Sequence, residues 1–155
     1  MMSCSLWFSI VLCEKFNADL VIVTDATYAE ETKACGIAAV LLDAEGRPRL
    51  AMGRQIEACN NEEGELRAIL FALEEIPDDN TTILLQSDNK NAVAYLNREA
   101  RTGENEMRYV RKIWNRIKQK NLTVTFVWQS RSCNEVADAI AAVSTRTTSV
   151  WARIQ

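Results

Sequence analysis

Acidic residues occur at three points of this chain where carboxylates are hard to explain by structure alone. Asp25 follows the apolar, β-branched run at residues 20–24, and Asp88 follows a second apolar run at 81–87. Glu65 lies within the edge of the apolar arc of a predicted helix, whereas its charged neighbours Arg67 and Glu74 lie elsewhere on the helical wheel. A carboxylate directed toward a core is costly unless a partner or a metal ion binds it.

A fourth acid stands alone in an alanine-rich segment near the end of the chain. Asp138 is the only charged residue between Glu135 and Arg146, and its neighbours are small. Small side chains allow a helix to lie close to a sheet, so this segment can bring Asp138 to the other acids. We therefore consider Asp25, Glu65, Asp88 and Asp138 as one candidate metal-binding and catalytic cluster.

The composition restricts the chemistry that such a cluster can perform. The chain contains no histidine, which excludes serine or cysteine catalysis with a histidine base and histidine-ligated zinc. Carboxylates alone suit hard, oxygen-preferring ions such as Mg²⁺ or Mn²⁺. Two such ions about 4 Å apart can activate water and stabilise the leaving oxygen in phosphodiester cleavage.

The periodicity of the sequence predicts the elements that position these acids. Three strands, two of them joined by a turn at 44–48, are followed by a helix, a strand, two helices, a strand and a helix. The expected fold is α/β, with a mixed five-stranded sheet flanked by helices. The strands are expected at 20–24, 36–43, 49–57, 81–87 and 122–128, and the helices at 60–76, up to 96, at 104–120 and from about 135.

The predicted topology would bring two of the acids together. If the first and fourth strands are parallel neighbours, Asp25 and Asp88 both emerge at the carboxyl edge of the sheet, where sites form in open α/β sheets. Each acid also has a structural alternative, because aspartate is a common turn former. Glu65 could likewise be a glutamate at the border of the apolar stripe that reaches solvent.

Length and composition indicate one ordinary domain. The chain has 155 residues and a net charge of −3. Its five cysteines are scattered along the sequence, which favours reduced thiols and a cytoplasmic location. We expect a domain at 18–147 and a tail at 148–155.

Residues 1–17 are expected to form an apolar appendage, either an added strand or short helix or a flexible segment. The apolar run at 6–13 is too short to span a membrane, for which about 20 residues are needed. No protein partner is indicated, and a monomer is expected.

Four segments resemble motifs of the ribonuclease HI family, in the family's order. VIVTDAT is similar to its first-strand aspartate motif, CNNEEGELRAILFAL to its N-N-x-x-E helix, LLQSDNKNAV to its strand-end aspartate motif and SCNEVADAIAAVS to its closing helix. The resemblance extends over residues 20–145, and the last segment is most similar to the histidine-lacking branch found in archaea, plants and some bacteria. It implies the ribonuclease H-like fold.

The resemblance also implies an activity and a set of functional residues. The activity is endonucleolytic cleavage of the RNA strand of an RNA–DNA hybrid to 3′-hydroxyl and 5′-phosphate ends. Two Mg²⁺ or Mn²⁺ ions would be held by Asp25, Glu65, Asp88 and Asp138. Hybrid contacts would come from the helix-start asparagines and the loop before the last helix. Independently of the resemblance, the basic residues that crowd the helix at 104–120 could contact phosphates or could equally form only a solvated face. These substrate-binding candidates are Asn60, Asn61, Asn134, Arg131, Arg108, Arg111 and Lys112.

Two other functions remain open at this stage. Another nuclease or a nucleotidyl transferase could use the same fold and the same acids. A catalytically silent nucleic-acid-binding module could keep the fold alone, although such a module has no reason to retain four costly carboxylates. The negative charge requires that basic residues be clustered if nucleic acid is the partner.

Overall fold

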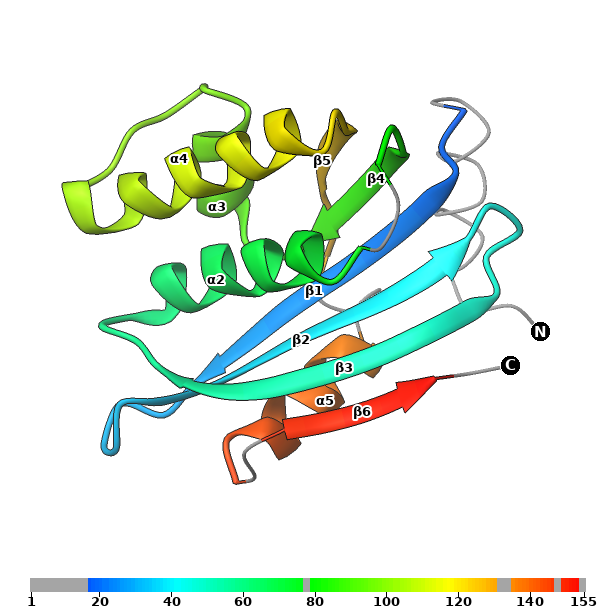
Figure 1. Ribbon diagram of the computed structural model, residues 1–155. Coiled ribbons are helices and arrows are strands. Elements are labelled where there is room, and N and C mark those ends of the chain that lie inside the picture. Colours follow the sequence, from blue (N-terminus) through cyan, green and yellow to red (C-terminus); the bar gives the residue numbers. More distant parts are fainter. Residues whose placement is uncertain (1–16, 77–78, 131–134, 147–148, 154–155) are drawn as a thin grey trace.

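A six-stranded mixed sheet forms the centre of the protein, in the order β5-β4-β1-β2-β3-β6 (Figure 1). The computed structural model describes residues 17–76, 79–130, 135–146 and 149–153. Strand β1 is antiparallel to β2 and parallel to β4, and β4 is parallel to β5. The strands are β1 (Leu20–Tyr28), β2 (Ala34–Asp43), β3 (Pro48–Glu57), β4 (Thr82–Ser87), β5 (Thr123–Trp128) and β6 (Ser149–Arg153).

The helices lie on both faces of the sheet (Figure 1). Helix α2 packs on β1 and β2 and also against α4, while α5 packs on the opposite face against β1, β2 and β3. In the described part of the chain, no helix is long and apolar enough to cross a membrane. The helices are α2 (Asn61–Glu74), α3 (Lys90–Leu96), α4 (Glu104–Gln119) and α5 (Glu135–Ser144).

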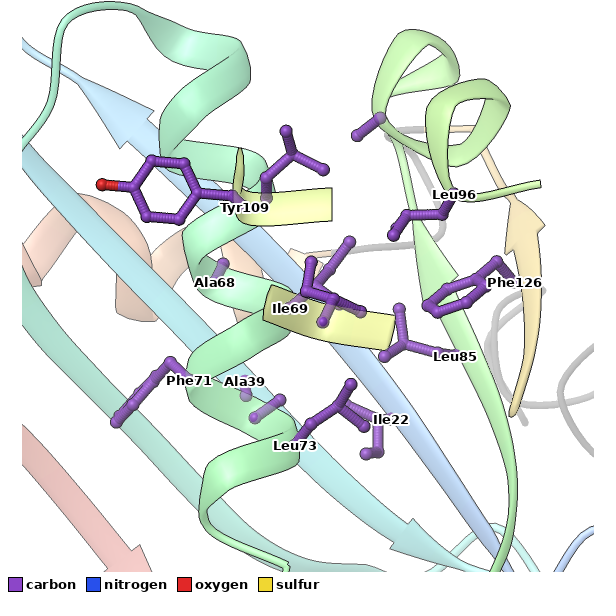
Figure 2. Packing of buried hydrophobic residues seen from close by; sticks show 14 of the residues in the cluster. Ile22, Ala39, Ala68, Ile69, Phe71, Leu73, Leu85, Leu96, Tyr109 and Phe126 are labelled. Carbon is purple, nitrogen blue, oxygen red and sulfur yellow. The ribbon is translucent and has the colours of Figure 1, made fainter. Parts of the chain in front are cut away.

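The larger hydrophobic core lies between the sheet and helices α2 and α4. Ile69 and Leu73 of α2, Ile22 of β1 and Leu85 of β4 belong to one cluster and are fully buried (Figure 2). Burying a side chain of this size stabilises a fold by about 1.5–3 kcal/mol. The apolar stripe of α2 is therefore what holds the helix, and with it Glu65, at a defined place above β1.

The five predicted strands and their mixed pairing are confirmed, with two corrections. Residues 149–153, which we assigned to a tail, form β6 and pair antiparallel with β3. Such a short edge strand depends on its pairing partner for stability, and a local pattern does not reveal this. Strand β1 also continues past the predicted end at Thr24, because β2 pairs with it as far as Tyr28. The predicted appendage at 1–17 lies, except for Asn17, outside the described residues.

Candidate metal centre

The parallel pairing of β1 and β4 brings the first two acids to one edge of the sheet. The pairing ends at Thr24 opposite Ser87, and Asp25 and Asp88 are the residues that directly follow this pair in the chain. Asp25 lies within β1, where it is 2% exposed, and Asp88 directly follows β4 and is half-buried. The predicted meeting of these two carboxylates at the carboxyl edge is therefore confirmed.

Glu65 approaches the same edge from the first turns of α2. Its side chain is 3% exposed, which excludes the alternative of a glutamate extending to solvent. Gly64 makes this approach possible, since a Cβ atom at that position would lie 2.5 Å from the Cys35 Sγ atom of β2. The absence of a side chain at Gly64 thus allows α2 to lie against the sheet beside Asp25.

The three acids form a compact set of oxygen donors. One carboxylate oxygen from each of Asp25, Glu65 and Asp88 lies within 4.8 Å of the other two. The Asp25 Oδ2 and Glu65 Oε2 atoms are buried and have no hydrogen-bond partner. Among the ion pairs of the described residues, none includes Asp25 or Glu65. Buried anionic oxygens without donors or cations fit a bound divalent cation, which takes oxygen ligands.

The electrostatics of the cluster agree with this fit. The pKa of Asp25 is raised to about 8, mainly by burial and secondly by the nearby charge of Asp88. Burial and the charges of Asp25 and Asp88 raise the pKa of Glu65 well above its usual value. The charged forms of these acids are therefore disfavoured until positive charge is supplied, and metal binding would be coupled to proton release.

Asp138 reaches the cluster from the other face of the sheet. It is half-buried on α5, and its carboxyl group forms a hydrogen bond with Asp25 that contributes to the raised pKa of Asp25. Helix α5 lies close to β2, where a Cβ atom at Gly36 would lie 1.8 Å from the carbonyl oxygen of Ala141. Asp138 is thus adjacent to Asp25, although the compact donor set contains only the other three acids.

The predicted substrate-binding residues differ in whether their side chains are exposed or already engaged by other residues of the protein. The Asn60 side chain caps α2 by accepting a hydrogen bond from the backbone N–H of Glu63, while Asn61 is exposed. Arg131 and Asn134 lie outside the described residues. On α4, Arg111 pairs with Glu104.

Two other basic candidates of α4 gather around one aromatic ring. The guanidinium carbon of Arg108 lies 4.8 Å from the centre of the Tyr109 ring, and the Lys112 Nζ atom lies 5.2 Å from it. Both cations remain exposed to solvent. They are therefore available to a phosphate, whereas the predicted neighbour Arg111 already has an acidic partner.

A second group of buried acids, not predicted from the sequence, joins the start of α2 to the start of α4. The Asn105 Nδ2 atom donates to Glu63 Oε1 at 2.7 Å, and the Asn60 Nδ2 atom donates to Glu106 Oε1 at 2.8 Å. We call these four residues the α2–α4 clasp. Glu106 lies on the apolar stripe of its helix with Val110 and buried neighbours, a signal that the criterion applied to Glu65 would have detected.

Comparisons with known proteins agree with the fold. Residues 23–144 match the family described as reverse transcriptase-like. A comparison with curated protein sequences gives no significant match.

Solved structures of ribonucleases H1 are similar over most of the chain. The enzyme from the halophilic archaeon Halobacterium salinarum NRC-1 is 20% identical, with a TM-score of 0.73 over 82% of this chain and 97% of that one. LC11-RNase H1, solved in complex with an RNA/DNA hybrid, is 19% identical, with a TM-score of 0.74 over 82% of this chain and 96% of that one. The RNase H domain of rv2228c from Mycobacterium tuberculosis is 16% identical, with a TM-score of 0.73 over 83% and 94% of the two chains. The chain therefore belongs to the reverse transcriptase-like family and has the ribonuclease H fold that its motifs predicted.

Proposed function

We propose that this protein is a metal-dependent endoribonuclease that cleaves the RNA strand of RNA–DNA hybrids to 3′-hydroxyl and 5′-phosphate ends. The observation that carries the proposal is the set of buried carboxylate oxygens at the carboxyl edge of the sheet, contributed by Asp25, Glu65 and Asp88. A site of this composition, on a ribonuclease H fold and without histidine, suits phosphodiester hydrolysis with divalent cations.

The residues of the site have distinct roles in this proposal. Asp25, Glu65 and Asp88 hold two Mg²⁺ or Mn²⁺ ions, and Asp138 completes the set from its position beside Asp25. When bound, such ions lower the pKa of water and stabilise the charge that develops on the leaving oxygen. The core-packed strands and α2 keep these carboxylates in place at the sheet edge, where the scissile phosphate would meet the bound ions.

The proposed substrate is supported by the exposed basic side chains of α4. Arg108 and Lys112 are exposed and can contact phosphates, which compensates locally for the net charge of −3. Such contacts position a duplex, whereas the distinction between RNA and DNA requires 2′-hydroxyl contacts. Asn61, exposed at the first position of α2, is the proposed residue for such a contact.

The test is cleavage of end-labelled RNA–DNA hybrid, double-stranded RNA and double-stranded DNA, each with Mg²⁺ and with Mn²⁺. We expect cleavage of the hybrid's RNA strand by the wild type and none by Asp25→Asn. The ends are identified by extending the products with a polymerase, which requires a 3′-hydroxyl, and by removing a 5′-phosphate with phosphatase. Cleavage of double-stranded DNA instead would indicate another nuclease of this fold. Binding without cleavage in either metal would indicate a silent binding module.

A further inference from the structure

An exposed tryptophan adjoins the metal centre at the end of the edge strand β5. Trp128 is 42% exposed, and it is the one aromatic residue among the large exposed hydrophobics of the described chain, the others being Val136 and Val143. It pairs with Ser87, the residue that precedes Asp88, in the parallel ladder between β4 and β5. The indole therefore stands at the same sheet edge as the acids.

Two contacts hold the indole beside Asp88. The Trp128 Nε1 atom donates a hydrogen bond to the backbone carbonyl of Asp88 at 3.0 Å. The Lys90 Nζ atom lies 4.5 Å from the centre of the indole ring, and Lys90 is the exposed first residue of α3. An aromatic surface and a cation thus adjoin one of the metal-binding carboxylates, on the side of the sheet where β5 ends.

We infer that Trp128 and Lys90 form a nucleotide-contact platform for the strand whose phosphate lies at the metal centre. The inference rests on the proposed function and specifies a part of its substrate-binding surface. A phosphate at Asp88 places the adjoining nucleotide of the same strand next to the indole. The ring contacts its base or sugar and the Lys90 ammonium pairs with its phosphate, the combination by which proteins bind single nucleic acid strands.

A purely structural role makes a different prediction, and this difference gives the test. If Trp128 only supports Asp88 through its indole N–H, phenylalanine cannot replace it. If the aromatic surface contacts a nucleotide, phenylalanine retains most of the function and alanine does not. Hybrid binding is therefore measured by fluorescence anisotropy with labelled RNA–DNA hybrid in the Asp25→Asn background, which prevents cleavage.

We expect Trp128→Ala to raise the Kd for the hybrid about tenfold, since loss of one base–aromatic stack weakens binding by about 5- to 150-fold. Trp128→Phe should stay within about threefold of the parent. Lys90→Gln should reduce the salt dependence of binding by about one counterion, and Lys90→Arg should retain it. Val143→Ala, which removes another exposed hydrophobic side chain, serves as the control and should bind normally.

A spectroscopic measurement complements the binding assay. Hybrid should quench the tryptophan fluorescence of the parent, and the part of the quenching due to Trp128 should be missing in Trp128→Phe. Unchanged binding in Trp128→Ala overturns the inference, and so does an equal loss in the Phe and Ala variants. If the parent binds no hybrid, the inference fails together with the proposed function. If wild-type protein cleaves hybrid and Trp128→Ala cleaves equally well at limiting substrate, the inference alone fails.

Discussion

Two groups of buried carboxylates lie near the first turn of α2, and their surroundings are opposite. In the metal centre, Asp25 and Glu65 have buried oxygens with no donor, and the pKa of each is raised. In the α2–α4 clasp, Glu63 accepts hydrogen bonds from Asn105 and from the backbone of Cys59. The hydrogen bond from Asn60 lowers the pKa of Glu106 in the same clasp.

The comparison shows that burial alone does not identify a functional acid. Glu63 and Glu65 are two residues apart and are 2% and 3% exposed, yet one is hydrogen-bonded through both oxygens and the other retains an oxygen without a donor. A satisfied buried carboxylate contributes to the fold, whereas an unsatisfied one costs free energy unless a proton or a bound cation neutralises it. The clasp therefore holds the start of α2 in place, and this places Glu65 in the candidate metal centre.

The largest expected effect is that of Asp25→Asn in the candidate metal centre, which should lower activity and raise stability. Asp25→Asn should reduce hybrid cleavage by about 10³-fold or more, corresponding to about 4 kcal/mol of transition-state stabilisation. The same variant should raise the free energy of unfolding of the metal-free protein at pH 8, because it removes a repelling charge from the cluster. Urea unfolding with a chelator and initial rates with Mn²⁺ measure the two quantities. A variant less stable than the wild type would contradict the comparison.

Substitution in the clasp should lower the free energy of unfolding, in contrast to Asp25→Asn. Glu63→Ala leaves the Asn105 side chain and the Cys59 N–H without their acceptor, which should lower the free energy of unfolding by about 2–4 kcal/mol. Glu31→Ala, at an exposed position in the turn after β1, is the control and should change stability by less than about 0.5 kcal/mol. Chemical denaturation measures both. A stabilised Glu63→Ala variant would show that the clasp resembles the metal centre.

The pH dependence of stability should also have opposite signs in the two groups. Asp25 has a folded pKa of about 8, above its unfolded value, so between about pH 4 and 8 the folded state binds more protons than the unfolded state. Stability of the metal-free protein should therefore fall as pH rises, by up to about 1.4 kcal/mol per pH unit for this group. Glu106 has a lowered pKa, so its contribution is present at neutral pH and is lost as pH falls through that lowered pKa.

Urea unfolding in chelator from pH 3 to pH 9 tests these signs. Asp25→Asn should flatten the loss of stability between pH 5 and pH 8, and Glu106→Gln should flatten the loss in acid. Saturating Mn²⁺ should abolish the fall in stability above about pH 5, because the metal-bound folded state and the unfolded state then both hold the Asp25 carboxylate deprotonated. A wild type that is most stable at pH 8 in chelator would be inconsistent with a metal-free cluster of this kind.

The smallest expected effect comes from the glycine that lies between the two groups. Gly64→Ala places a Cβ atom 2.5 Å from the Cys35 Sγ atom, and this clash should destabilise the protein by about 1–2 kcal/mol. The higher helix propensity of alanine should offset part of that cost. Cys35→Ala should be destabilising alone but should relieve the contact in the double variant. Thermal melts of the four proteins give the coupling. Additive effects would mean that Gly64 does not determine how closely α2 approaches the sheet.

Much of the site was predictable because its signals are local. Glu65 stood on an apolar arc, and Asp25 and Asp88 each followed an apolar run, so residue type and periodicity were sufficient to select them. Glu106 carried the same local signal as Glu65, but its partner in the clasp was not predictable, because Asn60 and Glu106 are 46 positions apart. Trp128 was read only as the end of a strand, since exposure at an edge is not visible in a six-residue pattern.

The sequence by itself determined which acids the chain carries, the order of its first five strands and four helices, and the absence of histidine chemistry. Only the tertiary structure decided that Asp25, Glu65 and Asp88 converge within 4.8 Å, and that Asp138 reaches Asp25 from the opposite face. It also decided that residues 149–153 form an edge strand. The physical reason is that periodicity records how one element faces the core. Convergence depends on parallel pairing and close helix approach between segments distant in sequence.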